Sequence, residues 1–494
     1  MPPKATHVFS PALVWLRRDL RLSDNPALTA AAASGRPVVA VFIDDATTLG
    51  AASRWWRGRS LAALSRDIAR LGSRLILRQG NALDHLMGLA EEIGAKELHF
   101  NQRFEPHDLA EDARIMTELR GVGVAVHEHQ GNRLHAPTAL KTLKGDPFRV
   151  FTPFWRRLAE SYRSPQRHAA PKSLAAPTAW PHSADLAAFQ ITAPWTEGMQ
   201  MHWQPGEAGA AALMDQVKAK LPNYGEHRDR PDVGGTSRLS PHLAWGEISV
   251  HDIWRRLATH GNPAENGFLR ELGWRDFNTH LLYHFPKLPT RNWNPRFDDF
   301  PFENSTEQLK AWQRGLTGYP IVDAGMRELW TTGWMHNRLR MIVASFLIKD
   351  LLIDWRKGEA WFWDTLVDAD LAQNAGNWQW VAGSGADAAP YFRVFNPTTQ
   401  SIKFDPDGAY IRRWVPELAK LPTPLIHAPS AAPATALAEA GIVLGRSYPT
   451  PLVDHAEARQ RALAVYSALS RNPDDMAEAT AAKLTARKPR DLFS

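Results

Sequence analysis

Residues that could carry chemistry gather in separate segments after residue 223. The first segment reads GGTSRLSP at 234–241, and Tyr224 and Arg228 lie before it. Glycines, hydroxyls and an arginine at the start of a helix favour an anion such as phosphate, because backbone N–H groups and the helix dipole attract it. An ordinary capped helix start has the same residue types, and the segment alone favours that simpler interpretation.

A second segment reads ELGWRDFN at 271–278. Its i, i+3 and i+4 spacing predicts one helical face shared by Glu271, Trp274, Arg275 and Asn278. A carboxyl group beside an indole suits a pocket for a flat heterocycle with carbonyl and N–H edges. Without further context, a solvated amphipathic face is the better explanation of the same residues.

A third segment reads WMHNRLRM at 334–341. Asn337 and Met341 are four residues apart, so their side chains project together from a helix. Arg338 and Arg340 point to different faces, and one of them could meet a phosphate while the other turns inward. The alternative is a helix with two exposed arginines and a methionine that fills the core.

The fourth segment reads DADLAQNAGNWQW at 368–380. Acids, amides and two tryptophans in so short a stretch suit the polar edge of a ring cofactor better than plain scaffold. We expect no metal site, because the nearby histidines offer no convergent set of ligands.

The first 130 residues alternate between strand and helix patterns. Apolar runs predict strands at 13–16, 38–43, 75–77, 98–100 and 122–126, and helical patterns separate them, for example at 52–71 and 83–93. Ser23-Asp24-Asn25-Pro26 has the polar caps and early proline of a helix start. The alternation predicts a Rossmann-like α/β domain with a parallel sheet over residues 1–130.

Beyond residue 130 the chain changes character. Prolines recur among alanines and serines at 131–205, which predicts a long surface connection between domains. From 206 to 494 the patterns are helical, for example at 208–221, 250–259, 326–353 and 359–366, and a last helix with a frayed basic end is expected. The second domain is therefore expected to be all-α.

Composition narrows the possible classes of function. The chain has 494 residues and no cysteine, which excludes disulfides, thiol nucleophiles and thiolate metal sites. A net charge of +6 hints at a polyanionic partner. No apolar run approaches the ~20 residues of a membrane span, and the N-terminus lacks a secretory signal pattern. We expect a protein of the cytoplasm with no membrane partner.

Together the four segments resemble the photolyase and cryptochrome flavoprotein family. The similarity begins with VWLRRDLRLSDNPAL at 14–28 and continues through GGTSRLSPHLAWGEIS, TGYPIVDAGMRELWTTGWMHNRLRM, DLLIDW and NWQWVAGSGADAAPYFRVFNPTTQSIKFDPDGAYIRRW. The phrases are long, and their order and spacing also agree. The resemblance covers essentially the whole chain, and it implies an α/β antenna domain and an all-α domain that binds FAD.

The resemblance implies a cofactor site by matching segments. Its residues would be Tyr224, Arg228, Thr236, Ser237, Arg238, Leu239, Ser240, Phe268, Glu271, Arg340, Asp368, Asp370 and Asn374. Arg340 would pair with Asp368 beside the flavin ring. Asn374 would face flavin N5, where an amide can hydrogen-bond without readily delivering a proton, which favours the reduced anion needed for repair.

The resemblance also implies a pocket for cyclobutane pyrimidine dimers in UV-damaged DNA, as in bacterial enzymes of the class I type. The residues would be Glu271, Trp274, Arg275, Asn278, Asn337, Arg338, Met341, Trp380 and Arg393. Arg338 and Arg393 would hold phosphates without reading sequence. The dimer would flip out of the duplex, and Glu271 would hydrogen-bond a base carbonyl while excited reduced FAD gives the dimer one electron.

Two features depart from the family pattern or stay open. Trp378 and Trp355 match the first places of an electron-transfer chain to the surface, but Phe302 stands where a third tryptophan is usual. Asp108 matches an acid that contacts the antenna pterin in folate-binding relatives. The expected antenna is 5,10-methenyltetrahydrofolate, with 8-hydroxy-5-deazaflavin as the alternative.

Other functions remain open at this point. A cryptochrome, which signals light on the same fold, would favour another residue at Asn374 and a long tail. An enzyme restricted to single-stranded DNA is disfavoured by Glu271, Trp274 and Met341, and a generic flavin oxidoreductase would usually show a G-x-G-x-x-G fingerprint. We expect a monomer that associates with the bacterial nucleoid through DNA.

Overall fold

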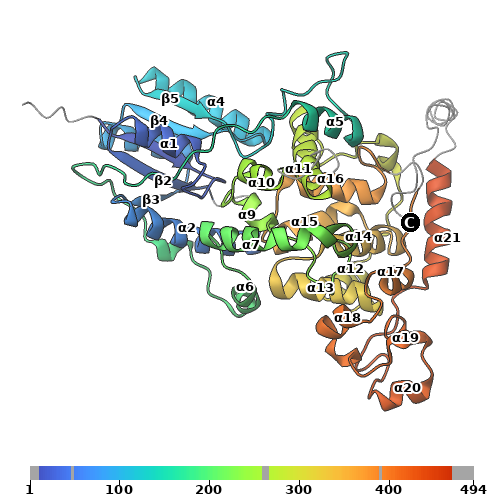
Figure 1. Cartoon of the computed structure of the whole chain (residues 1–494). Helices are drawn as coiled ribbons and strands as arrows, with labels where there is room; N and C mark the ends of the chain where they lie inside the picture. Colours follow the sequence, from blue (N-terminus) through green and yellow to red (C-terminus); the bar gives the residue numbers. More distant parts are fainter. Residues whose placement is uncertain (1–9, 46–48, 259–265, 389–391, 470–494) are drawn as a thin grey trace, which may run out of the picture.

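A parallel sheet forms the first part of the chain (Figure 1). The computed structural model describes residues 10–45, 49–258, 266–388 and 392–469. The strand order is β3-β2-β1-β4-β5. Their bounds are β1 Ala12–Leu16, β2 Val38–Asp44, β3 Leu75–Gln79, β4 Glu97–Asn101 and β5 Ala125–His129. β5 begins three residues later than expected, because Gly123, with φ +81°, occupies the turn that ends the preceding helix.

Helices cover both faces of this sheet. Helices α1 (Pro26–Ala33) and α2 (Ala51–Arg70) pack on one face, and α3 (Ala82–Glu92) and α4 (Pro106–Gly121) pack on the other. Asn25 caps α1 as expected, since its side chain accepts a hydrogen bond from the Leu28 N–H. The chain order of the strands reverses between β1 and β4, which is where ligands bind in open α/β sheets.

The connection at 131–205 is more structured than expected. It contains α5 (Phe151–Ser161), two short 3-10 turns (Leu186–Phe189 and Pro194–Thr196) and α6 (Glu197–His202). α5 packs on a helix of the second domain, where a Cβ at Gly273 would lie only 2.4 Å from Trp155 Cε3. Pro194 begins the second 3-10 turn, and the buried aromatic face of α5 joins the helical core.

The rest of the chain is all-α. Its helices are α7 (Glu207–Lys220), α8 (Tyr224–His227), α9 (Ser240–Ala244), α10 (Val250–Leu257), α11 (Gly267–His284), α12 (Thr306–Gln313), α13 (Pro320–Thr332), α14 (Asn337–Ser345), α15 (Trp355–Thr365), α16 (Leu371–Ala382), α17 (Pro397–Phe404), α18 (Ala409–Trp414), α19 (Thr423–Ile426), α20 (Ala434–Glu439) and α21 (His455–Leu469). No helix in the described ranges has the length and apolar character needed to cross a membrane.

The single helix expected at 326–353 is wrong. α13 ends at Gly333, whose left-handed φ of +67° closes the helix. His336 then begins α14, since its side chain accepts a hydrogen bond from the Arg338 N–H. A π-helical turn at Phe346–Asp350 follows directly. The break matters because it places Trp334 between the two helices and makes His336 the cap of the second one.

The α/β domain and the helical body dock closely. A Cβ at Gly246 would lie 2.1 Å from the Arg18 carbonyl oxygen, so only glycine allows this approach. Across the seam, Trp56 Nε1 donates to Glu247 Oε1 at 3.0 Å, and Ser53 Oγ donates to the Leu366 carbonyl at 3.0 Å. The docking brings residues from both halves of the chain to one interface.

Candidate functional site

The loop before α9 is held in place by tryptophans. Arg238, with φ +56°, lies over the rings of Trp203 and Trp334 at 4.4 and 4.9 Å. Trp334 Nε1 donates to Ser240 Oγ at 3.1 Å. A Cβ at Gly235 would lie 2.5 Å from His227 Cβ, so the loop also presses against α8. The loop is thus fixed in shape with its guanidinium between indoles.

The remaining residues of the loop have local partners. The Ser237 hydroxyl accepts a hydrogen bond from the Leu239 N–H at 3.3 Å. The Thr236 carbonyl accepts from Lys220 Nζ at 2.9 Å, which brings a positive charge to the loop. The helix that follows, α9, has only the five residues Ser240–Ala244. An anion at this loop would therefore be attracted more by side-chain charges than by the dipole of the helix.

Glu271 joins the expected cofactor residues to the expected substrate residues. Arg228 Nη1 donates to Glu271 Oε1 at 2.7 Å, and the Glu271 side chain keeps 37% of its surface exposed. Burial disfavours the charged form of Arg228, but the carboxylate of Glu271 prevails and raises its pKa. Tyr224 packs on Phe268 with ring centroids 5.4 Å apart and lies under the Arg228 guanidinium.

Arg340 and Asp368 meet as a close ion pair. Arg340 Nη2 donates to Asp368 Oδ2 at 2.8 Å. The other carboxylate oxygen of Asp368 is buried and has no hydrogen-bond partner among the described residues, and the same holds for Arg238 Nε and Trp378 Nε1. Buried polar atoms are normally satisfied, so the free oxygen of Asp368, beside the Arg340 guanidinium, is suited to a polar ligand.

Asn374 is held by α15. Its Nδ2 donates both to the Glu359 carbonyl at 2.9 Å and to Glu359 Oε1 at 2.8 Å. Burial raises the pKa of Glu359 to about 7, although the hydrogen bond from Asn374 favours the ionised form. The amide oxygen of Asn374 therefore stays available to an outside donor.

Glu271, Trp274, Arg275 and Asn278 all lie on α11, as the spacing predicts, but their side chains have different partners. Arg275 turns away from Glu271 and donates from Nη1 to the Asn132 carbonyl at 2.8 Å and from Nη2 to the Leu243 carbonyl at 3.2 Å. Burial, with the positive charge of Arg133 nearby, lowers the pKa of Arg275 to about 9. The long Arg275 side chain reaches these two carbonyls rather than Glu271, so Arg275 belongs to the domain seam.

Trp274 and Asn278 also have protein partners. The Trp274 ring stacks on Phe151 of α5, with centroids 3.6 Å and planes 8° apart. Asn278 Nδ2 donates to Gln373 Oε1 at 2.9 Å and thereby ties α11 to α16. Phe151 lies in the connecting segment, and sequence reasoning missed it because its partner on α11 is far away in the chain.

Arg338 is already paired within the protein. Its Nη2 donates to Asp229 Oδ2 at 2.7 Å, its guanidinium lies over Phe404, and its side chain is only 11% exposed. It therefore differs from the alternative of a helix with two exposed arginines, and a phosphate would have to compete with Asp229 for it. Asn337 at the start of α14 is exposed, and Met341 is half-buried against the helical core.

The last expected substrate residues lie beyond α16. Trp380 Nε1 donates to the Asp387 carbonyl at 3.1 Å. The Arg393 carbonyl accepts a hydrogen bond from Lys349 Nζ. Burial lowers the pKa of Lys349 to about 7.

The expected electron-transfer residues pack in different surroundings. Trp378 is buried and contacts Phe362 and Trp312, with ring centroids 5.0 and 6.3 Å apart. Trp355 is buried and donates from Nε1 to Asn292 Oδ1 at 2.9 Å. Phe302 packs on Phe300 at 4.8 Å.

Asp108 and Asp370 lie at a small cavity between the two domains. The cavity holds about 60 Å³ and is lined by Arg18, Gln102, Arg103, Phe104, Glu105, Asp108, Asn132, Arg133, Leu243, Ala244, Arg275, Thr279, Leu282, Asp370 and Ala372. Asp108 is paired with Arg103 at 2.8 Å. Burial opposes ionisation of Asp370, but Arg133 and Arg275 hold its pKa below the ordinary value. Asp370 thus faces the domain seam, while Asp368 faces Arg340.

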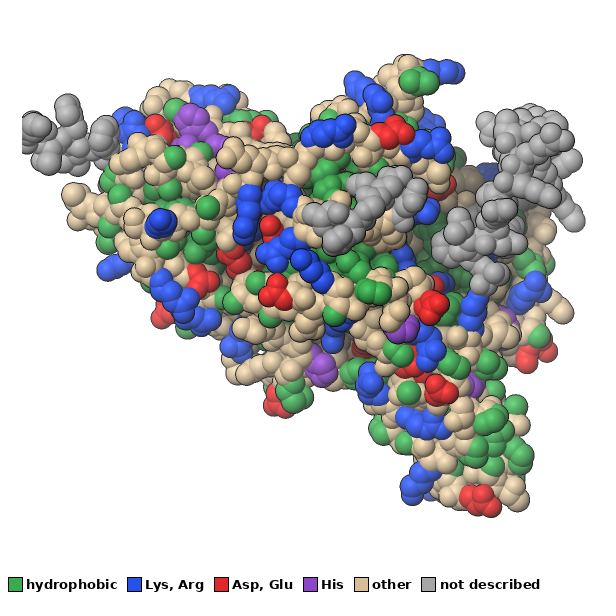
Figure 2. Space-filling view, viewed as in Figure 1, with side chains coloured by type: hydrophobic (Ala, Val, Ile, Leu, Met, Phe, Trp, Pro, Cys, Tyr) green, Lys and Arg blue, Asp and Glu red, His purple; other side chains and the backbone are tan. Residues whose placement is uncertain are grey.

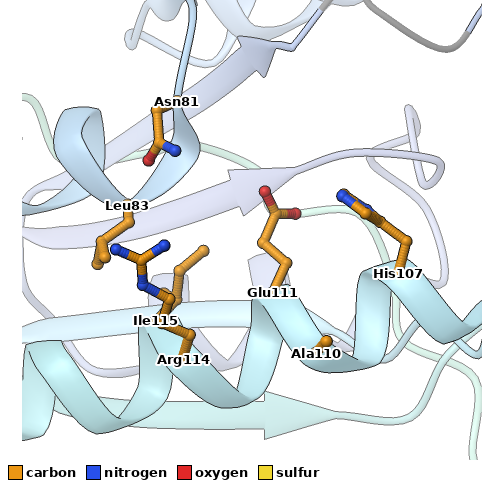
Figure 3. A pocket seen from close by; sticks show the side chains of 7 residues that line it. All are labelled: Asn81, Leu83, His107, Ala110, Glu111, Arg114 and Ile115. Atoms are coloured by element: carbon orange, nitrogen blue, oxygen red, sulfur yellow. The ribbon is translucent and has the colours of Figure 1, made fainter.

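A larger cavity of about 270 Å³ lies between α3 and α4 (Figure 3). Its lining residues are Asn81, Leu83, His107, Ala110, Glu111, Arg114 and Ile115. The side chains of Glu111 and His107 project from successive turns of α4, and Asn81 lies across from them. No sequence motif marks this cavity, because polar residues on an exposed helix face are common.

Comparisons with known proteins cover most of the chain. Residues 12–175 match the family "DNA photolyase", and residues 268–468 match the "FAD binding domain of DNA photolyase". The deoxyribodipyrimidine photo-lyase of Agrobacterium fabrum is 51% identical over 94% of this chain and 98% of its own. Cryptochrome-2 of Arabidopsis thaliana is 38% identical over 91% of this chain and 77% of its own.

The similarity extends to three-dimensional structure. A crystal structure of a bacterial class III photolyase from Agrobacterium tumefaciens superposes with a TM-score of 0.92 at 50% identity, over 96% of this chain and all of that one. The agreement spans the sheet, the connection and the helices alike.

Proposed function

Because the chain belongs to the photolyase and cryptochrome family, we propose that it repairs cyclobutane pyrimidine dimers in DNA, using blue light and reduced FAD. The observation that carries this proposal is the ion pair between Arg228 and Glu271 at 2.7 Å. Arg228 is expected at the cofactor and Glu271 is expected to contact the dimer, so this ion pair brings the cofactor site and the dimer site together. The class III relative favours that class over the class I type expected from the sequence.

The residues present fit FAD. Arg238, Ser240 and Lys220 lie at the loop suited to the diphosphate, and the unpartnered Asp368 Oδ1 and Trp378 Nε1 offer polar contacts to the rest of the molecule. When bound in reduced form, FAD would supply the photochemistry: one electron is given to the dimer under light and recovered after the ring opens.

The chain's own residues would position the flipped dimer. Glu271 would hydrogen-bond a base carbonyl and steady negative charge on the base. Trp274 would offer the ring face that Phe151 leaves uncovered, and Trp380, Asn337 and Met341 would close around the bases. Asn374, held by Glu359, would keep its amide oxygen toward the cofactor.

DNA would be held by basic residues that read no sequence. Arg338 would serve only if the phosphate displaces Asp229 from its guanidinium. Arg393 is the second candidate for a phosphate contact. The protein would act as a monomer in the bacterial cytoplasm on nucleoid DNA, with an antenna domain at 1–130, a connection at 131–205 and a catalytic domain at 206–494.

The antenna pigment would be 5,10-methenyltetrahydrofolate, with 8-hydroxy-5-deazaflavin as the alternative. The seam cavity at Asp108 holds about 60 Å³, far below the ~300 Å³ at which ligand pockets usually begin. The cavity of about 270 Å³ between α3 and α4 is closer to that size. A pigment at Asp108 would therefore lie largely outside this cavity as it stands.

A repair assay tests the proposal. Purified protein with reduced FAD is incubated under blue light with an oligonucleotide that contains a thymine dimer, and the return of thymine absorbance is followed. We expect repair in light and none in the dark. A light-sensing cryptochrome would leave the dimer intact.

The variant Glu271→Gln sharpens this test. Gln keeps an oxygen that can accept from Arg228, so we expect FAD to be retained. Repair should slow by at least about tenfold, because the complete loss of one charge-stabilising contact costs about 10²–10³-fold and Gln keeps part of it. Glu226→Gln on the exposed side of α8 is the matched control and should repair normally. Loss of FAD in Glu271→Gln would leave Glu271 with its expected cofactor role and contradict its role at the dimer.

A further inference from the structure

A cluster of imidazoles and a carboxylate lies at the open edge of the sheet, away from the site described above. Glu97 and His99 lie on β4, and His127 lies on the edge strand β5. The register pairs His99 with His127, and residues two apart on a strand share a face, so all three side chains point the same way. Figure 2 shows histidine side chains gathered over β4 and β5.

The ligand atoms of these residues lie close together. One ring nitrogen or carboxylate oxygen from each of Glu97, His99 and His127 falls within 4.8 Å of the others. Glu97 Oε2 and His99 Nε2 are 3.3 Å apart. Two ligands on a tetrahedral zinc ion, each bound at about 2.0–2.1 Å, are about 3.3–3.4 Å apart, so this pair already has the required spacing.

The neighbours of the cluster orient its ligands. Arg36 Nε donates to Glu97 Oε1 at 2.9 Å, which leaves Oε2 facing His99. His99 Nδ1 lies 3.1 Å from His129 Nε2. If Nε2 of His99 binds a metal, Nδ1 must carry the proton, and His129 is placed to accept it. Metal-bound histidines commonly donate their second N–H in this way.

We propose that Glu97, His99 and His127 form a binding site for a borderline divalent metal such as Zn²⁺. Two imidazoles and one carboxylate are a known zinc ligand set. His127 is exposed and His99 is buried, so water can reach the ion from one side and complete its coordination. The ion would join the edge strand β5 to β4 and would take no part in the repair chemistry.

Zinc uptake tests the proposal. The full-length protein with bound FAD is stripped with a chelator, dialysed against micromolar Zn²⁺ and analysed for metal. We expect one Zn²⁺ per chain, and a higher thermal midpoint with Zn²⁺ than without. Light-driven repair should be the same in both forms, which separates this proposal from the proposed function.

Variants locate the site. His127→Ala removes an exposed ligand and should fold, and Glu97→Gln keeps the shape while removing the charge. We expect each to weaken Zn²⁺ binding at least tenfold and to abolish the zinc-dependent rise in thermal midpoint. The control His202→Ala removes an exposed histidine on α6 and should bind like the unaltered protein. Unchanged zinc binding in both cluster variants, or no uptake by the unaltered protein, would overturn the proposal.

Discussion

At the scale of single residues, the site depends on which polar atom faces which. Asp368 gives one oxygen to Arg340 and leaves the other without a protein partner within the described ranges. Asn374 donates from its amide nitrogen to two oxygens of Glu359, so its amide oxygen is left to accept from another donor. The protein therefore fixes the direction of each polar group before any ligand binds, which is how preorganised sites avoid reorganisation during a reaction.

The pair Asn374–Glu359 predicts a pH effect. The folded pKa of Glu359 is about 7, above its usual 4.5, so ionisation costs stability as the pH rises from about 4.5 through 7. Glu359→Gln removes this cost and still accepts from Asn374. With the partial exposure of Glu359 taken into account, this substitution should raise the free energy of unfolding above pH 7 by about 1–2 kcal/mol. We expect a higher thermal midpoint than the unaltered protein at pH 8 and a much smaller difference at pH 5. Equal differences at both pH values would contradict the assignment.

Phe302 predicts a limit on photoreduction. Phenylalanine is much harder to oxidise than tryptophan, and Phe302 packs on another phenylalanine. We therefore expect Phe302→Trp to speed the photoreduction of oxidised FAD severalfold in the presence of an external donor, as followed by flavin absorbance. Phe302→Leu is the control for packing and should not speed it. An unchanged rate in Phe302→Trp would mean that electrons leave through other tryptophans.

At the scale of elements, local patterns were predicted well and long-range contacts were not. Asn25 caps α1, and apolar residues form the central strands. Both features depend on residues that are neighbours in the chain, so the sequence alone predicts them. The break at Gly333 was missed, because an apolar helical pattern continues across it. The turn of Arg275 toward the seam depends on the Asn132 and Leu243 carbonyls, which no spacing rule on α11 could reveal.

The packing of α5 on α11 makes a prediction at this scale. A Cβ at Gly273 would lie 2.4 Å from Trp155 Cε3, so Gly273→Ala must push the two helices apart. Overpacking of this kind costs about 1–3 kcal/mol, and it also moves Phe151 from under Trp274. We expect a lower thermal midpoint and weaker binding of dimer-containing DNA.

The control for this prediction is Gly225→Ala on α8, where nothing lies within 4 Å of the added Cβ. It should leave both measurements unchanged. A normal thermal midpoint in Gly273→Ala would show that α5 moves away without cost.

At the scale of the whole molecule, the two domains are joined by much more than the connecting segment. Arg18 Nη1 donates to the Ala369 carbonyl at 3.2 Å, and Arg21 Nη1 donates to the Gly246 carbonyl at 2.9 Å. Asp370, two residues from Asp368, pairs with Arg133 of the connecting segment. The backbone segment that contains Asp368 is thus held by Arg18 of the α/β domain and by Arg133 of the connection. Docking of the α/β domain and binding of the cofactor should therefore be coupled.

Gly246→Ala tests that coupling. The added Cβ would lie 2.1 Å from the Arg18 carbonyl oxygen, and Gly246 also has a left-handed φ of +64°. Gly441→Ala imposes comparable backbone strain at φ +73° with nothing within 4 Å of its Cβ, so it isolates the effect of the clash. We expect Gly246→Ala to lower the thermal midpoint well beyond the control, to expose the 131–205 connection to limited proteolysis and to weaken FAD retention. If Gly246→Ala loses stability but binds FAD as tightly as the control, the α/β domain does not support Asp368, because the helical body would then hold the cofactor residues alone.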